Sequence, residues 1–265
     1  MNKSVKKQSE FYLLPNLFTT AALFFGFFSI LNAMNGKFEF AALAIFFALV
    51  MDGLDGRVAR LTNTESKFGA EYDSLSDMVS FGVAPALVMY VWALKPLGKI
   101  GWIGAFIYCA CAAFRLARFN TKLDVLEKKY FFGFPSPAAA ALVAAFIWVC
   151  IDNGISGNDI FLNFFQMQWF ALVMILIAAL SMVTDIKYYS GKDVNLRNSV
   201  PSVSILLIVM AFSLLSHSPA EIIFIIIFGY LLSGYLNVFR ENFTIKKKNN
   251  RKKKKQINEK YLILL

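Results

Sequence analysis

The sequence has few charged residues and only one histidine, and both scarcities narrow the class of protein. Only 17% of its 265 residues are charged, whereas 58% are hydrophobic. A soluble domain carries about 25% charged residues, so this composition excludes an ordinary soluble protein and predicts a membrane protein. The single histidine, His217, lies far along the chain from the acidic clusters, which excludes histidine-based acid–base or metal chemistry.

Cysteine is also scarce. Cys109, Cys111 and Cys150 lie inside apolar stretches and form no CxxC pair. We therefore interpret them as small buried hydrophobic residues rather than as metal or redox groups.

Long apolar stretches recur along the whole chain. Most approach the roughly 20 residues that an α-helix needs to cross about 30 Å of hydrocarbon. They span residues 11–34, 38–51, 78–94, 100–114, 136–151, 164–184, 200–215 and 220–239. We therefore predict an all-α fold, a polytopic membrane helical bundle of about eight transmembrane helices.

Basic residues are unevenly distributed between alternate loops, which predicts the orientation of the bundle. Segments 1–10, 57–67, 115–129, 187–197 and 240–260 together hold 24 of the 27 lysines and arginines. Since basic residues concentrate in cytoplasmic loops, both termini and the segment between Asp52 and Asp77 are predicted on the cytoplasmic side of the cell membrane.

The C-terminal end is strongly basic and divides the chain into a membrane domain, 1–240, and a tail, 241–265. Residues 246–260, KKKNNRKKKKQINEK, contain nine basic residues and one acid. Such a tail beside a cytoplasmic helix end is expected to lie on anionic lipid headgroups. A solvated, unattached tail is the alternative, and nucleic acid is the least favoured partner.

Four aspartates interrupt the apolar pattern near this cytoplasmic surface. Asp52 and Asp55 follow one apolar stretch at a spacing of i, i+3, and Asp73 and Asp77 precede the next at i, i+4. Each pair projects from one face of its helix, so we expect the four carboxylates to meet. Close carboxylates repel one another unless cations neutralise them, and hard divalent ions prefer oxygen ligands. The pattern therefore predicts a site for two cations, Mg²⁺ or Mn²⁺.

Small residues and an arginine share these faces. Gly56, Ala59 and Gly69 each lie four residues from one of the aspartates. They would let a ligand approach the helix backbone, or they would allow close helix packing. Arg60 would either grip a phosphate or extend its charge to the membrane surface.

Together these residues resemble the complete signature of the CDP-alcohol phosphatidyltransferases. The pattern is Asp52-Gly-Leu-Asp55-Gly56-x2-Ala59-Arg60-x8-Gly69-x3-Asp73-x3-Asp77. The resemblance implies that the four aspartates hold two divalent cations and that Asp77 is the general base. It also implies a CDP-linked lipid in contact with Gly56, Ala59, Arg60 and Gly69, a six-helix catalytic core, and a homodimer.

Two further stretches bear on the acceptor alcohol. FRLARFN, residues 114–120, places Arg115 and Arg118 at i, i+3, either as a clamp for an anionic group or as arginines that mark the cytoplasmic side. FFGFPSPAAA, residues 131–140, begins a helix at which Ser136 is a candidate cap. Together the two stretches resemble the phosphatidylserine synthase branch of the family, which implies CDP-diacylglycerol and L-serine as substrates. Phosphatidylglycerophosphate synthase is the alternative within the family.

Weaker candidates lie at the same depth of the membrane. Asn16, Thr19 and Thr20, in LPNLFTT, would reach the nucleotide, unless they cap a helix after Pro15 or make ordinary interhelical hydrogen bonds. Lys187 is a candidate acceptor contact or a charge that sets the topology.

Proteins of another class also bury acids in the membrane. A cation or proton transporter would mark its ion path with carboxylates, but no acid or base here continues a path to the opposite surface. A prenyltransferase would carry two acidic motifs far apart in sequence.

Overall fold

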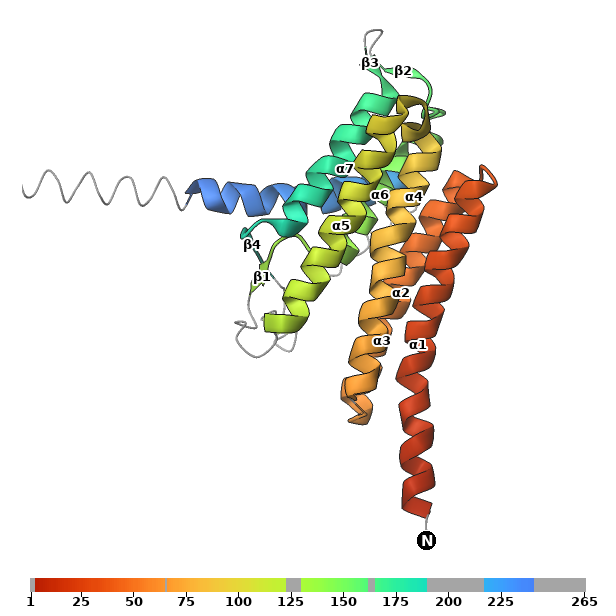
Figure 1. The fold of residues 1–265 in the computed structure, drawn as a ribbon, viewed down its shortest axis with the longest axis vertical. Helices are drawn as coiled ribbons and strands as arrows, with labels where there is room; N and C mark the ends of the chain where they lie inside the picture. The colour runs from red at the N-terminus through yellow and green to blue at the C-terminus, as the bar shows by residue number, and fades with distance from the viewer. Residues whose placement is uncertain (1–2, 65, 123–129, 162–164, 190–216, 241–265) are drawn as a thin grey trace, which may run out of the picture.

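The computed structural model describes residues 3–64, 66–122, 130–161, 165–189 and 217–240, which form a bundle of helices (Figure 1). Its helices are α1 (Lys3–Met34), α2 (Phe38–Thr62), α3 (Lys67–Asp77), the π-helix η1 (Met78–Val83), α4 (Ala84–Met89), the π-helix η2 (Tyr90–Leu94), the 3-10 helix η3 (Lys95–Leu97), α5 (Lys99–Lys122), α6 (Ser136–Asp152), α7 (Met167–Val183) and a last helix, Pro219–Arg240.

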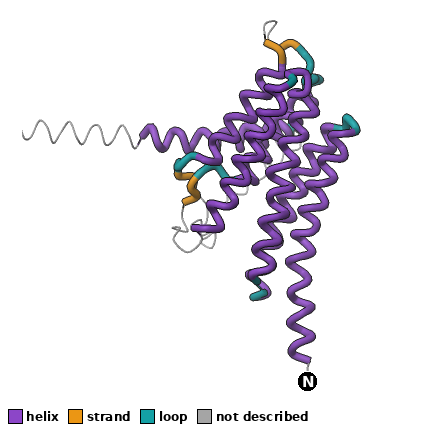
Figure 2. The backbone as a smooth tube through the Cα atoms, viewed as in Figure 1, coloured by secondary structure: helices purple, strands orange, loops and turns teal. Residues whose placement is uncertain are grey.

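Strands are few and very short, as Figure 2 shows. β1 (Tyr130–Phe132) pairs antiparallel with β4 (Lys187–Tyr189). β2 (Ile160–Phe161) pairs antiparallel with β3 (Phe165–Gln166). Both pairings join loops between helices, so the prediction of an all-α helical bundle is confirmed.

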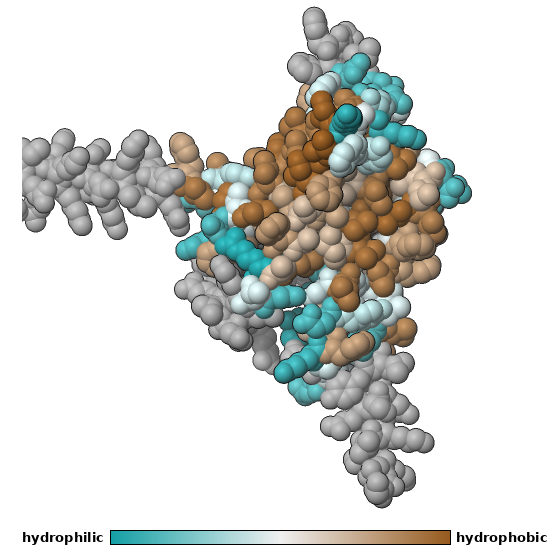
Figure 3. Space-filling view, viewed as in Figure 1, coloured by the Kyte–Doolittle hydropathy of each residue, from teal (hydrophilic) through white to brown (hydrophobic). Residues whose placement is uncertain are grey.

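Within the described residues, four helices are long and apolar enough to cross a membrane. They span Leu14–Met34, Lys67–Leu97, Lys99–Thr121 and Pro219–Arg240, while α6 and α7 are shorter apolar helices. On the visible face, hydrophobic side chains cover the middle of the bundle and hydrophilic ones gather above and below it (Figure 3). This distribution is that of a membrane protein.

Some predictions fall on parts of the chain that are not described. The apolar stretch 200–215 and the basic tail 241–265 lie outside the described residues, so the helix predicted at 200–215 and the division at residue 240 stay predictions.

The segment from Lys67 to Leu97 forms one continuous helical rod, although the apolar pattern begins only at residue 78. The rod starts early because the Ser66 hydroxyl caps it, accepting a hydrogen bond from the Gly69 amide at 3.0 Å. Asp73 and Asp77 therefore lie inside a regular helix, α3.

Helix α1 also extends further than a proline would suggest. It continues through Pro15, so the alternative that a helix starts and is capped just after this residue is wrong. Further along α1, the Ser29 hydroxyl donates to the Ala41 carbonyl of α2 at 2.7 Å. Such short polar links between helices suit a bundle whose buried faces carry small residues, among them Ala41, Ala42 and Ala48 of α2.

The last helix lies across the bundle and extends beyond it on one side (Figure 1). Near its start, Glu221 accepts a hydrogen bond from Asn153, just beyond the end of α6, at 3.3 Å. Near its end, the Tyr235 and Ser181 hydroxyls lie 2.7 Å apart at the end of α7. The amide of Phe134, just before α6, donates to the Ser181 carbonyl, so α7 ends where α6 begins. We call this end, where α2 also ends and α3 begins, the acidic end.

Candidate active site

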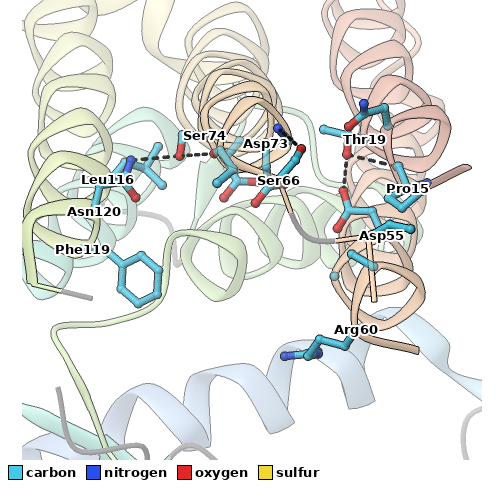
Figure 4. Close-up of a pocket in the computed structure, with 17 residues that line it drawn as sticks. Pro15, Thr19, Asp55, Arg60, Ser66, Asp73, Ser74, Leu116, Phe119 and Asn120 are labelled. Atoms are coloured by element: carbon cyan, nitrogen blue, oxygen red, sulfur yellow. Dashed lines mark hydrogen bonds between the residues drawn. The ribbon is translucent and has the colours of Figure 1, made fainter. Parts of the chain in front are cut away.

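A cavity of about 490 Å³ opens at the acidic end of the bundle, between α1, α2, α3 and α5. Figure 4 shows residues from these helices turned toward one another around it. The cavity is lined by Pro15, Asn16, Thr19, Asp55, Gly56, Ala59, Arg60, Thr64, Ser66, Gly69, Ala70, Asp73, Ser74, Asp77, Leu116, Phe119 and Asn120.

Three of the four predicted aspartates, Asp55 of α2 and Asp73 and Asp77 of α3, line this cavity, and the fourth, Asp52, lies beside Asp77. The Asp52 carboxyl group interacts with that of Asp77, and the Asp55 carboxyl group interacts with that of Asp73. One carboxylate oxygen each from Asp52, Asp55 and Asp73 can be chosen so that all three lie within 4.8 Å of one another. The helical spacings thus place two carboxyl groups of α2 opposite two carboxyl groups of α3.

Helix α1 is hydrogen-bonded to both helices that carry the acidic cluster. The Thr19 hydroxyl, which is 3% exposed, lies 2.7 Å from Asp55 Oδ2 and donates to it. The Ser76 hydroxyl of α3 donates to the Thr19 carbonyl at 3.0 Å. Thr19 therefore connects all three helices at the level of the carboxylates.

The cluster has the features of a divalent cation site. Within the described part of the chain, Asp73 Oδ1 is buried and accepts no hydrogen bond. A buried acceptor without a partner costs about 1–3 kcal/mol, and more when it is charged. A cation among these oxygens would satisfy Asp73 Oδ1 and reduce the repulsion between the carboxylates. The residues present therefore fit a hard divalent ion.

The small residues of the signature lie on the cavity wall. A methyl group added at Gly56 would meet no atom of the described residues within 4 Å, so helix packing does not explain this glycine. At Gly69 the added carbon would lie 3.1 Å from Ser66 Oγ and 3.5 Å from Asn16 Oδ1, a tight fit. Ala59 and Arg60 also line the cavity, and Arg60 is exposed. The space at Gly56 favours close approach of a ligand.

The two candidate arginines of α5 have different environments. Arg115 is half-buried, and its Nη1 donates to the Ser136 hydroxyl at 2.6 Å. Its Nε is buried and makes no hydrogen bond within the described residues, and the guanidinium interacts electrostatically with Asp77. An unsatisfied buried donor beside the carboxylates is suited to an anionic ligand.

Arg118 points away from this cluster. It forms an ion pair with Asp185, whose side chain is 80% exposed, and lies 3.4 Å from the Val183 carbonyl oxygen. Lys187 is exposed, with its Nζ 5.9 Å from the centre of the Phe132 ring. None of Arg115, Arg118 and Lys187 is among the residues that line the cavity.

Ser136 differs from its expected role. α6 begins at Ser136, the cap position is Pro135, and no side chain caps the helix. The Ser136 hydroxyl, fully buried, instead accepts the hydrogen bond from Arg115.

Other cavity residues were not anticipated from the sequence. Asn120 Nδ2 donates to Ser74 Oγ at 2.9 Å, which joins α5 to α3 across the cavity wall, and Phe119 faces the same space (Figure 4). Ser74 follows Asp73 directly, and Asn120 ends the FRLARFN stretch. Both are therefore next to residues that the sequence had marked as candidate site residues. Their pairing depends on two segments far apart in sequence, which no local pattern reveals.

Comparisons with known proteins agree with this geometry. The family model of CDP-alcohol phosphatidyltransferase matches residues 12–184. A CDP-diacylglycerol–serine O-phosphatidyltransferase of Helicobacter pylori is 37% identical over 230 residues, which cover 85% of this chain and 90% of that protein. Proteins of the same name are 42% identical in Methanocaldococcus jannaschii, covering 54% of this chain and 61% of theirs, and 35% identical in Saccharomyces cerevisiae, covering 63% and 66%.

Proposed function

This chain belongs to the CDP-alcohol phosphatidyltransferase family, and we propose that it transfers the phosphatidyl group of CDP-diacylglycerol to L-serine, with release of CMP. The observation that carries the proposal is a cluster of four aspartates, three of which line a cavity of about 490 Å³ in a membrane helix bundle. Its relatives from a bacterium, an archaeon and a yeast are all named for serine as the acceptor. The enzyme is accordingly a CDP-diacylglycerol–serine O-phosphatidyltransferase.

The acidic cluster would hold the metal. Asp52, Asp55, Asp73 and Asp77 offer enough oxygens for two divalent cations, and Mg²⁺ or Mn²⁺ suits such hard ligands. When bound, the cations would neutralise negative charge on the diphosphate and on the departing CMP. The unsatisfied Asp73 Oδ1 supports this assignment.

Asp77 is the proposed general base. It lines the cavity, and it lies opposite Asp52 and within electrostatic reach of Arg115. Its carboxylate would take the proton of the serine hydroxyl while that oxygen attacks the phosphorus bearing the diacylglycerol. A bond forms between the serine oxygen and this phosphorus, and the bond from the phosphorus to the CMP oxygen breaks.

The side of the cavity formed by α1 and α2 is suited to the CDP group. Gly56 leaves open space, Asn16 and Thr19 contribute polar groups, and Arg60 adds a positive charge at the cavity wall. We assign Ala59 and Gly69 to the same contact surface, since both line the cavity. An arginine beside a diphosphate would form charge-assisted hydrogen bonds with it.

Arg115 is the residue proposed to bind the serine carboxylate. Arg115 Nε is buried and unsatisfied within the described residues, while Arg118 is engaged by Asp185 outside the cavity. A carboxylate that enters a cavity rich in acids needs a cation, and a guanidinium provides directed donors. These contacts favour Arg115 over both Arg118 and Lys187.

The enzyme is further proposed to act at the cytoplasmic face of the cell membrane as a homodimer. The uneven distribution of basic residues supports the cytoplasmic orientation of the acidic end and of both termini. This position would keep the lipid tails in the bilayer while serine arrives from water.

A panel of acceptors tests the proposed reaction. Purified protein is supplied with CDP-diacylglycerol, Mn²⁺ or Mg²⁺, and one of L-serine, glycerol 3-phosphate or inositol, and both CMP and the lipid product are measured. Phosphatidylserine formed only with L-serine is the expected result. A product with glycerol 3-phosphate but not with serine would identify a phosphatidylglycerophosphate synthase. Absence of CMP with every acceptor and both metals would refute the transferase assignment.

A further inference from the structure

The helix that carries the proposed base changes its type immediately after that residue. α3 ends at Asp77, and the π-helix η1 occupies Met78–Val83. At the end of η1 the Ala84 amide donates to the Val79 carbonyl, five residues earlier, instead of four as in an α-helix. Short π-helical turns are rare and occur often at functional sites, so η1 calls for an explanation in terms of the residues it positions.

The π-turn directs successive residues to different neighbours. An extra residue in a turn rotates the helix that follows by about 100° relative to an unbroken α-helix. Ser80, which is fully buried, donates to the Ala22 carbonyl of α1 at 3.0 Å. The carbonyl of Phe81, one residue later, accepts a hydrogen bond from α5. Directly beyond Asp77, η1 is therefore hydrogen-bonded to α1 on one side and to α5 on the other.

The bond from α5 is made by a tyrosine in the apolar core. Tyr108 is fully buried, and its hydroxyl donates to the Phe81 carbonyl at 3.1 Å. Burying a hydroxyl without a hydrogen-bond partner costs free energy. This bond therefore strongly favours the one placement of α5 relative to η1 in which the bond forms. Gly82 keeps the contact close, since a carbon added there would lie 3.0 Å from Met78 Cε and 3.3 Å from Ala112 Cβ of α5.

Tyr108 shares one face of α5 with the proposed serine-binding arginine. The two residues are seven apart, which is two helical turns or about 10 Å along the axis. On the facing rod, Phe81 lies four residues beyond Asp77, and Asp77 interacts electrostatically with Arg115. The two antiparallel segments thus face each other at two levels, with Tyr108 and Phe81 in the core and Arg115 and Asp77 at the level of the acidic cluster.

We propose that Tyr108 is a positioning residue, whose hydrogen bond to the π-turn fixes where Asp77 and Arg115 stand relative to each other. The inference rests on the proposed roles of these two residues and adds to them. It assigns Tyr108 to the acceptor half of the reaction, because the CDP-binding wall is formed by α1, α2 and the start of α3. Loss of the hydroxyl should therefore impair the use of serine and spare the binding of CDP-diacylglycerol.

The test compares Tyr108→Phe with Tyr188→Phe in the full-length protein in detergent. Both tyrosines are fully buried, and the Tyr188 hydroxyl also lies near a backbone carbonyl, that of Leu231, at 3.4 Å. A misplacement of about 1 Å can cost roughly 100-fold in rate, so a fall of about tenfold or more in kcat/KM for serine is expected for Tyr108→Phe. The Kd for CDP-diacylglycerol should stay within about twofold, and Tyr188→Phe should keep normal turnover.

Three outcomes would overturn the inference: unchanged kcat/KM for serine in Tyr108→Phe, an equal fall in Tyr188→Phe, or an equal loss of CDP-diacylglycerol binding. If Tyr108→Phe does not yield folded protein, Gly82→Ala decides by the same criteria, because its added methyl group crowds Met78 and Ala112 at the contact between η1 and α5 and leaves every hydroxyl in place. Asp77→Asn is measured in parallel. Normal turnover of that variant would refute the proposed base, whereas an inactive Asp77→Asn beside a normal Tyr108→Phe refutes only the role of Tyr108.

Discussion

The Thr19 hydroxyl donates a hydrogen bond to Asp55 Oδ2 at 2.7 Å, and both residues are buried. This bond ties the acidic cluster of α2 and α3 to α1, the helix on the other side of the cavity. The Asp55 carboxyl group also interacts with that of Asp73. The bond therefore orients a carboxylate that, by our proposal, binds a divalent cation.

Thr19→Val is expected to weaken metal activation. The substitution keeps the shape of the side chain and removes the hydroxyl. A hydrogen bond to a charged group contributes about 1.5–3 kcal/mol, so the Mn²⁺ concentration for half-maximal activity should rise by about tenfold or more. The measurement is a Mn²⁺ titration of CMP release at saturating substrates.

Thr20→Val is the matched control for this titration. The Thr20 hydroxyl donates to the Asn16 carbonyl at 2.7 Å and lies 2.9 Å from the Tyr72 hydroxyl, but it does not contact an aspartate. Its loss should leave the Mn²⁺ requirement within about twofold of the original. Equal shifts in the two variants would show that α1 responds to any lost hydroxyl and would refute the specific role of Thr19.

Asp77→Asn and Asp52→Asn should impair different steps, turnover in the first variant and binding in the second. General acid–base catalysis contributes about 10²–10⁴-fold, so Asp77→Asn should lower kcat by about 100-fold or more while three carboxylates still support binding of CDP-diacylglycerol. Asp52→Asn should weaken metal binding and nucleotide binding together. Turnover and the Kd for CDP-diacylglycerol are measured for both variants, and near-normal turnover of Asp77→Asn would contradict its assignment.

The acidic cluster could be predicted from the sequence because it depends on local spacing. Asp52 with Asp55, and Asp73 with Asp77, each lie on one helix, so the helical period alone places each pair on a single face. Apolar stretches of the right length predicted the helices for the same reason. The start of α3 at Lys67 lies a few residues earlier than the sequence predicted, because the cap at Ser66 extends the helix through polar residues that no apolar pattern marks.

The environments of the arginines could not be predicted in this way. Arg115 and Arg118 look equivalent in the sequence, since both lie in one basic stretch at the end of α5. The structure separates them through partners from distant segments, Ser136 at the start of α6 and Asp185 beyond α7. The π-turn after Asp77 was likewise invisible, because its hydrogen bond to Tyr108 joins helices far apart in sequence.

The orientation of the bundle is open to a labelling experiment. Cys109, Cys111 and Cys150 are first replaced, and single cysteines are then introduced as Lys67→Cys at the acidic end and Asn153→Cys at the opposite end, two positions that are exposed. In intact cells a membrane-impermeant thiol reagent should label only Asn153→Cys, because basic loops are retained in the cytoplasm. Labelling of residue 67 in intact cells, or of both positions alike, would reverse or exclude the proposed topology.

Arg115→Lys should raise the KM for serine, because lysine cannot reproduce the geometry of a guanidinium. In the structure Arg115 Nη1 is bound to Ser136, and the buried Nε is left for a further acceptor. A lysine has a single charged nitrogen and must give up one of these contacts. Since a hydrogen bond between charged groups contributes about 1.5–3 kcal/mol, the KM for serine should rise by about tenfold or more. The Kd for CDP-diacylglycerol should change far less.

Arg118→Lys provides the comparison, because it makes the same chemical change three residues along α5. Arg118 is paired with the largely exposed Asp185, and such surface ion pairs contribute about 0–1 kcal/mol. A lysine there can keep the pair, so the KM for serine should stay within about threefold. Initial rates of phosphatidylserine formation over a range of serine concentrations give both KM values. A larger increase for Arg118→Lys than for Arg115→Lys would mean that Arg118, rather than Arg115, binds the serine carboxylate.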